Sequence, residues 1–215
     1  MDPLLNLRSV PGSSCLLPGV AQATMQGEAH SGDQCIVLDL PGGCLVAVAD
    51  GLGHGPEAAR AALLAMTVLR EGPHTSVIQQ IRKCHEALRT TRGVVLSLAL
   101  FNFAEETVAW LGVGNVGGVL VRASAAPGEP GREYLLCRGG VVGAQLPALH
   151  AGVMPMAPGD TLMFHTDGVE ARCAAEFNDV LSHPQAAADE LLRNWSKGND
   201  DALVLVARYL GGSRA

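Results

Sequence analysis

Residues 46–64 constrain the fold of this chain more than any other stretch, because they join an apolar segment, a glycine-rich turn and an alanine-rich segment. Residues 46–49 are small or β-branched and predict a buried strand, and Pro56 with the alanine-rich run after it predicts a helix start. Between them lie Asp50, three glycines and His54. A carboxylate at the end of a buried strand needs a cation, a donor or a proton to compensate its charge. The turn is therefore either a metal-binding loop or a simple cap of the following helix.

The composition favours one domain with an aliphatic core. Of the 215 residues, 48% are hydrophobic but only 4% are aromatic, and 26 are glycine. The core must therefore be built from Val, Leu, Ala and Ile, with many tight turns. We expect residues 1–20 to be a lead-in or an edge strand, and residues 21–211 to form the single domain.

Charge and cysteine spacing argue against several classes of protein. The net charge is −6 and Lys and Arg do not cluster, so a nucleic-acid partner is not expected. No run approaches the roughly 20 apolar residues that span a bilayer, and the N-terminus does not resemble a secretory signal. The six cysteines form no C-x-x-C pair and are expected to be reduced core residues. We therefore expect a cytoplasmic protein without a membrane partner.

The remaining chain switches between helical and strand periodicity. Helices are expected over residues 56–70, 77–88 and 184–195. Strands are expected over residues 35–40, 44–49, 94–103, 107–113, 117–122, 134–138, 161–166 and 202–207. Paired helices between runs of antiparallel strands predict an α+β fold with two facing antiparallel sheets and helices outside. A doubly wound parallel sheet would need strands and helices to alternate one by one, which they do not.

Acidic residues stand at the ends of several predicted buried strands, namely Asp33, Asp50, Asp167 and the pair Asp200 and Asp201. The hairpin predicted around residues 41–43 puts Asp33 and Asp50 at the same end. If the other strand ends join them, like charges meet in a partly dry place, which is costly unless cations lie among them. Oxygen ligands suit Mg²⁺ or Mn²⁺ rather than zinc or copper. The alternative is that each aspartate caps only its own turn.

Two such cations would lower the pKa of a shared water and neutralise a bound phosphate, which points to phosphoester hydrolysis without a protein nucleophile. Covalent catalysis is poorly supported, since no serine stands in a G-x-S-x-G elbow and no cysteine has evident activating neighbours. Residues 112–117 match G-x-G-x-x-G, the dinucleotide-binding pattern. An apolar strand follows them instead of a helix, so we interpret them as a hairpin turn.

Three motifs in this order resemble the PPM (PP2C-type) metal-dependent serine/threonine phosphatases: residues 49–55 (A-D-G-L-G-H-G), 166–168 (T-D-G) and 199–201 (N-D-D). The D-G-x-G-H-G form before an alanine-rich helix is similar to the bacterial SpoIIE group. The compact length, with residues 114–116 (G-N-V) and 139–143 (G-G-V-V-G), further resembles the small stressosome-feedback phosphatases of the RsbX kind. The resemblance covers the chain from about residue 27 onward and implies a PP2C-like α-β-β-α sandwich.

The resemblance also implies a set of ligands for two Mn²⁺ or Mg²⁺ ions. Asp50 would bridge them, the Gly51 carbonyl and Asp33 would complete one site, and Asp167 and Asp200 the other.

Of the acidic pair, Asp201 is the less favoured ligand. His54 would protonate the leaving serine or threonine oxygen, or order metal-bound water. Thr166 and Leu203 replace the usual Ser and Thr without removing a ligand, and the phosphate-gripping arginine of eukaryotic members has no counterpart.

The expected activity is removal of phosphate from phosphoserine or phosphothreonine of a bacterial regulatory protein. By resemblance, the partner would be an anti-sigma-factor antagonist or a stressosome scaffold in stress-response signalling. The alternative is a catalytically silent domain that binds a phosphoprotein or regulator through the same surface.

Overall fold

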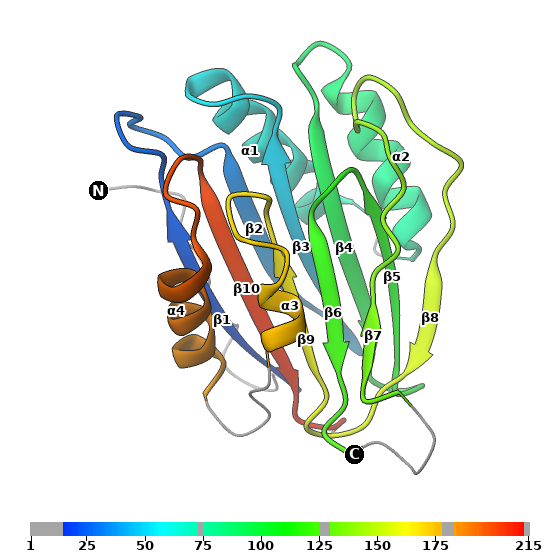
Figure 1. Cartoon of the computed structure of the whole chain (residues 1–215). Helices are drawn as coiled ribbons and strands as arrows, with labels where there is room; N and C mark the ends of the chain where they lie inside the picture. Colours follow the sequence, from blue (N-terminus) through cyan, green and yellow to red (C-terminus); the bar gives the residue numbers. More distant parts are fainter. Residues whose placement is uncertain (1–14, 73–74, 125–129, 178–182, 213–215) are drawn as a thin grey trace.

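The strands of the computed structural model form two antiparallel sheets that face each other, with helices on both outer sides (Figure 1). The structure describes residues 15–72, 75–124, 130–177 and 183–212. All pairings between its strands are antiparallel. The predicted α+β class with two facing sheets is confirmed.

The first sheet has the strand order β1-β10-β9-β6-β7. Its strands are β1 (Leu16–Ala23), β10 (Ala202–Tyr209), β9 (Thr161–His165), β6 (Gly117–Val121) and β7 (Arg132–Tyr134). The short helix α3 (Cys173–Glu176) and the longer α4 (Pro184–Trp195) lie on its outer face (Figure 1).

The second sheet has the strand order β2-β3-β4-β5-β8. Its strands are β2 (Asp33–Leu40), β3 (Gly43–Gly51), β4 (Val94–Asn102), β5 (Thr107–Val113) and β8 (Gly152–Pro155). Helices α1 (Pro56–Glu71) and α2 (Val77–Leu88) cover its outer face (Figure 1).

Strand β3 shows how the sequence builds the layers. Its side chains alternate between two cores, as the pleat of a strand requires. Leu45, Ala47 and Ala49 pack with the helices α1 and α2. Cys44, Val46 and Val48 pack between the two sheets. Both faces are buried, which explains why the sequence of β3 is continuously apolar.

Three parts of the chain differ from the sequence-based expectation. Residues 152–155 form the strand β8, where no strand was expected. Residues 16–23 form the edge strand β1, in agreement with one of the two alternatives given for residues 1–20. In the expected strand 134–138, only Tyr134 belongs to a strand, β7. The turn at residues 112–117 is not a hairpin turn, because β5 belongs to the second sheet and β6 to the first. It carries the chain from one sheet to the other.

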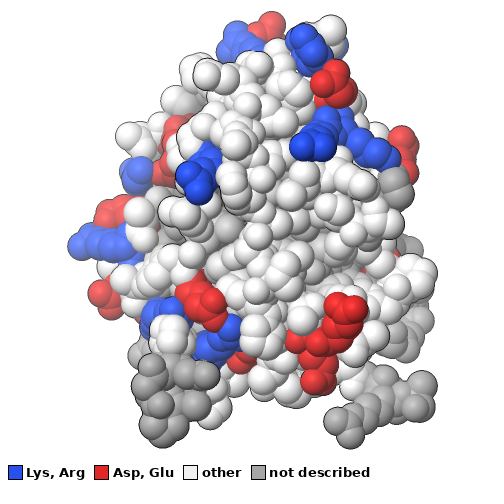
Figure 2. Space-filling model, turned by 90° about the vertical axis from the view of Figure 1, so that its right-hand side faces the viewer, with Lys and Arg blue, Asp and Glu red and all other residues white. Residues whose placement is uncertain are grey.

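The strands β7 and β8 end their sheets on the same side of the molecule. The face that they form is uncharged in its middle, with charged side chains around it (Figure 2). Tyr134, Leu136 and Val153 are exposed there. No helix within the described residues is long and apolar enough to cross a bilayer.

Candidate metal centre

Asp33 and Asp50 are direct neighbours on adjacent strands. They are cross-strand partners at the end of the β2–β3 pair, as the predicted hairpin requires. The Gly51 N–H donates to the Gly32 carbonyl over 3.1 Å, which continues the pairing one step beyond. Two carboxylates therefore meet at one end of the second sheet.

Asp33 connects the two sheets. Its side chain is almost fully buried, and the Thr166 hydroxyl at the end of β9 donates to its Oδ2 over 2.7 Å. The same hydroxyl accepts from the Leu203 N–H over 2.9 Å. Burial, followed by repulsion from Asp50, raises the pKa of Asp33 well above its ordinary value, although the Thr166 hydrogen bond acts in the opposite direction. The Thr166 hydroxyl therefore links Asp33 of β2 to the backbone of β10.

The electrostatics of Asp50 indicate that the remaining aspartates converge on it. Burial, followed by repulsion from Asp167, Asp200 and Asp201 in that order, raises the pKa of Asp50 to about 7. These residues lie far apart in the sequence, but the ends of β3 and β9 and the start of β10 meet at one end of the molecule (Figure 1). The aspartates thus lie close enough to interact with one another.

The turn after β9 is packed tightly against the start of β10. A Cβ on Gly168 would overlap the backbone carbonyl of Asp201, so only glycine fits between them. Asn115, from the crossing between the sheets, donates from Nδ2 to Asp167 Oδ2 over 2.8 Å. This hydrogen bond orients the Asp167 carboxylate.

The acidic pair at the start of β10 is divided between two environments. Asp201 is buried, and its carboxylate accepts from the Gly32 N–H over 2.7 Å and the Met25 N–H over 2.8 Å. Asp200 is exposed and accepts from the Asp201 N–H over 2.8 Å. Both oxygens of Asp201 are thus occupied by backbone donors, whereas Asp200 has free acceptor capacity.

The glycine-rich loop brings a histidine to the same end of the molecule. Gly53 and Gly55 have φ values of 84° and 77°, which favour glycine. His54 Nδ1 lies 2.6 Å from Glu28 Oε1, and a Cβ on Gly55 would lie 3.0 Å from the other Glu28 oxygen. The second glycine therefore lets Glu28 approach the loop and orient the imidazole. A Cβ on Gly51 would overlap the Ala58 carbonyl, so this glycine lets α1 pack directly on the strand end.

The donor set suits a hard divalent cation. Every candidate ligand except His54 offers oxygen. The pKa values of Asp33 and Asp50 are raised, so their charged forms are disfavoured, and no basic side chain among the described residues opposes this rise. Within the described ranges, no three His, Cys, Asp or Glu side chains form a ready metal-binding cluster. The carboxylates nevertheless lie close enough to repel one another, and a cation would relieve that repulsion.

Sequence reasoning missed Glu28 and the buried role of Asp201. Glu28 stands in no recognisable motif and approaches His54 only through the fold. Leu203, which departs from the usual Thr, contributes through its backbone N–H, so its side chain identity is not used at this contact.

Comparison with known proteins agrees with this geometry. The sequence model of the SpoIIE family (Stage II sporulation protein E) matches residues 41–210. Phosphoserine phosphatase RsbX of Bacillus subtilis (strain 168) is 26% identical over 164 residues, which make up 76% of this chain and 77% of that protein.

Two solved structures share the fold. One, from work on the bacterial stressosome as a modular system for control of secondary messenger signaling, has a TM-score of 0.82 and 28% identity over 90% of this chain and 99% of that one. RsbX in complex with magnesium has a TM-score of 0.78 and 20% identity, over 90% of this chain and 94% of that one.

The chain has two facing antiparallel sheets between helical layers, with aspartates gathered at one end. This fold and the matches to known proteins identify it as a PP2C-type phosphatase. Within that class, this chain belongs to the SpoIIE family. It is thus an enzyme of the protein phosphatase class, and the family resemblance predicted from its motifs is confirmed.

Proposed function

We propose that this protein is a metal-dependent phosphatase that hydrolyses phosphoserine or phosphothreonine on a bacterial regulatory protein. The convergence of Asp33, Asp167, Asp200 and Asp201 on Asp50 carries this proposal. The name of its relative, phosphoserine phosphatase RsbX, supports the choice of phosphorylated side chain. The similarity to a chain studied with the bacterial stressosome supports a partner in stress signalling, either an anti-sigma-factor antagonist or a stressosome scaffold. The free cysteines agree with action in the cytoplasm.

Each ligand has a proposed position in a two-ion centre. Asp50 would bridge the ions, Asp33 and the Gly51 carbonyl would hold one, and Asp167 and Asp200 the other. Two Mn²⁺ or Mg²⁺ ions, when bound, would neutralise phosphate charge and supply a water of lowered pKa. Thr166 would fix Asp33, and Asn115 would fix Asp167, through the hydrogen bonds that they donate. Asp201 would hold the loop before β2 rather than an ion.

The test of this activity is phosphate release from a phosphoserine regulator in Mn²⁺ and in excess chelator. Asp50→Asn should reduce kcat by roughly a hundredfold or more, because the bridging carboxylate is lost. Glu190→Gln, an exposed change on α4, is the matched control and should keep full activity. No release from any phosphoprotein, together with intact partner binding by Asp50→Asn, would favour the silent binding domain instead.

His54 would donate a proton to the serine or threonine oxygen that leaves when the P–O bond breaks. Glu28 would act as a positioning residue that orients the imidazole. His54→Gln should reduce kcat for a phosphoserine peptide by about 10²–10⁴-fold, the usual contribution of a general acid. It should reduce kcat for p-nitrophenyl phosphate far less, since that leaving group needs no proton. Equal losses on both substrates would exclude this role.

A further inference from the structure

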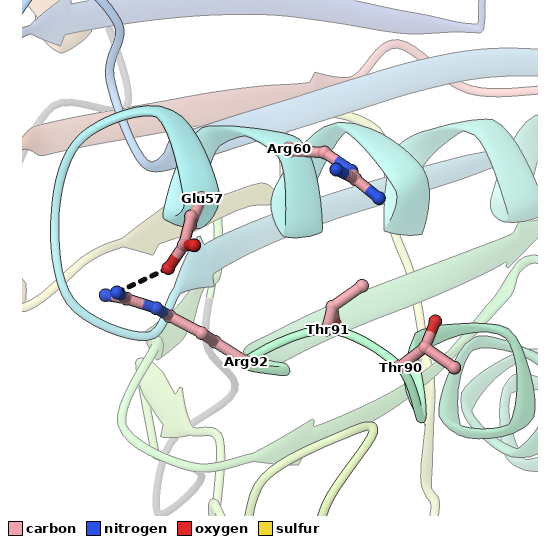
Figure 3. Close-up of a pocket in the computed structure, with 5 residues that line it drawn as sticks. All are labelled: Glu57, Arg60, Thr90, Thr91 and Arg92. Carbon is pink, nitrogen blue, oxygen red and sulfur yellow. Dashed lines mark ion pairs between the residues drawn. The ribbon is translucent and has the colours of Figure 1, made fainter.

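A cavity lined by polar side chains lies between the first turns of α1 and the segment that joins α2 to β4, near the candidate metal centre. Its volume is about 230 Å³, several times that of a water molecule, so it can hold the end of a charged side chain. It is lined by Glu57, Arg60, Thr90, Thr91 and Arg92 (Figure 3). We call it the arginine pocket.

The arginine pocket adjoins the glycine-rich loop that carries Asp50. The Leu52 N–H donates to the Gly93 carbonyl over 3.1 Å, which joins the loop to the segment before β4. A Cβ on Gly53 would lie 3.0 Å from Nη1 of Arg92. Gly53 is three residues from Asp50, so their Cα atoms lie at most about 11 Å apart. One substrate segment can therefore reach both the metal centre and the pocket.

The pocket carries more positive than negative charge. Arg92 and Glu57 form an ion pair and point toward each other (Figure 3). Both side chains are more than half exposed, so their pairing is weak, and one carboxylate leaves several guanidinium donors of Arg92 free. Arg60 lies one turn along α1 from Glu57, and it forms no ion pair with any residue that the structure describes.

The two threonines differ in what they can offer a ligand. The Thr91 hydroxyl donates to the Leu88 carbonyl over 2.7 Å and accepts from the Gly93 N–H over 3.0 Å, so it shapes the turn. The Thr90 hydroxyl has no partner in the described part of the chain, and it is exposed at the pocket. The described lining of the pocket thus comprises two arginines, one threonine hydroxyl without a partner and one carboxylate.

We propose that the arginine pocket binds an anionic side chain of the phosphoprotein substrate, a carboxylate or a second phosphate, next to the phosphoserine or phosphothreonine that is hydrolysed. This inference rests on the proposed function. Guanidinium groups bind carboxylate and phosphate through paired hydrogen bonds, so both sources share one chemistry. The net charge of −6 and the aspartate cluster oppose an acidic substrate. A basic pocket beside the cluster offsets this repulsion and selects substrates by the residues around the phosphate.

Three phosphoserine peptides of one sequence test the proposal. The peptides differ at two positions near the phosphoserine. Both positions are Glu in the first peptide and Gln in the second, and in the third peptide one of the two positions is a second phosphoserine. Wild-type kcat/KM should be roughly fivefold or more higher for at least one anionic peptide than for the Gln peptide, since exposed ion pairs contribute modestly. The anionic peptide that gains identifies the ligand as carboxylate or phosphate.

Arg60→Gln and Arg92→Gln should bring this ratio toward one, mainly through KM. The control is Arg89→Gln, an exposed arginine outside the pocket that pairs with Glu86 over 3.6 Å, and it should keep the wild-type ratio. A ratio near one in the wild type, or the same loss in Arg89→Gln, would overturn the proposal.

Binding in chelator separates this inference from the proposed function. Fluorescence anisotropy of labelled peptides without metal should show the same preference for the anionic peptide and its loss in Arg60→Gln. If no peptide releases phosphate but this preference remains, the pocket proposal is supported and the phosphatase proposal is wrong. If peptides release phosphate and the metal-free protein shows no preference, the pocket proposal is wrong.

Discussion

Asp200 and Asp201 are chemically identical neighbours whose surroundings give them different tasks. Asp201 is buried with two backbone N–H donors on its carboxylate, and Asp200 is exposed at the end of the strand pair. The resemblance of the motif alone favours Asp200 over Asp201 as a metal ligand. The hydrogen bonds give a physical reason for that preference.

Separate substitutions should divide stability from metal binding. Asp201→Ala leaves the N–H groups of Gly32 and Met25 without an acceptor, so it should lower the free energy of unfolding in chelator by about 1–3 kcal/mol. Asp200→Ala should leave that free energy nearly unchanged and weaken Mn²⁺ binding instead. Urea unfolding and calorimetric Mn²⁺ titration measure the two effects. Stronger loss of Mn²⁺ affinity in Asp201→Ala would reverse the assignment.

Asp50 should make the metal-free protein sensitive to pH. Its pKa rises from 3.8 to about 7 on folding, so the folded state binds more protons than the unfolded state in this range. The contribution of Asp50 to the free energy of unfolding in chelator should therefore be highest below about pH 4. It should fall as the pH rises toward 7. The loss is at most about 4 kcal/mol at 1.36 kcal/mol per pKa unit. Asp50→Asn should flatten the profile measured by urea unfolding, and an unchanged slope would contradict the burial of this charge.

Among the elements, β1 shows how an open sheet edge is protected. It is the last strand of the first sheet. The Gln185 side chain of α4 accepts from the Val20 N–H over 3.0 Å and donates to the Val20 carbonyl over 2.8 Å. A Cβ on Gly19 would overlap the backbone of α4, so glycine permits this close approach. The amide of Gln185 thus replaces a neighbouring strand.

Gln185→Ala should lower the free energy of unfolding by about 1–3 kcal/mol, because both backbone groups of Val20 lose their partner. The control is Gln79→Ala, an exposed glutamine of α2. Thermal or urea unfolding of both variants measures the difference. Equal effects in the two variants would show that solvent replaces the amide at no cost.

The predictability of each element follows from its periodicity. The helices at 56–70, 77–88 and 184–195 were predicted within a residue, because each has one continuous apolar face. The four-residue strand β8, with its residues largely exposed, has no buried face that would mark it in the sequence. The turn at 112–117 was assigned to a hairpin because local pattern does not tell which sheet the next strand joins.

The site was predictable where strand ends carry acids and unpredictable where contacts depend on the fold. The pairing of Asp33 with Asp50 follows from the register of the β2–β3 hairpin, which its short turn fixes. The contact of Glu28 with His54 spans a loop without regular structure, and the arginine pocket joins two segments that no motif connects.

At the scale of the molecule, three apolar cores stack in order: α1 and α2 against the second sheet, the space between the sheets, and the first sheet against α3 and α4. The proposed metal ligands stand at the end of the middle layer. Asp33 and Asp50 belong to the second sheet, and Asp167 and Asp200 flank strands of the first.

Metal ions should therefore stabilise the whole fold. At a Mn²⁺ concentration of about 100 times Kd, binding contributes about 2.7 kcal/mol, which corresponds to a rise in Tm of roughly 5–10 °C for a chain of this size. Asp200→Ala should lose most of that rise, and the exposed control Glu190→Ala should keep it. Differential scanning calorimetry in Mn²⁺ and in chelator measures both. An unchanged Tm in saturating Mn²⁺ would contradict a centre built on both sheets.

The hydrogen bond from Thr166 to Asp33 crosses the boundary between the layers at the point where catalysis is proposed. A small slide of one layer past the other changes the separation of the two acidic halves, even if no atom of the loops is touched. The relative position of the two sheets therefore also sets the distance between the aspartates that each sheet contributes.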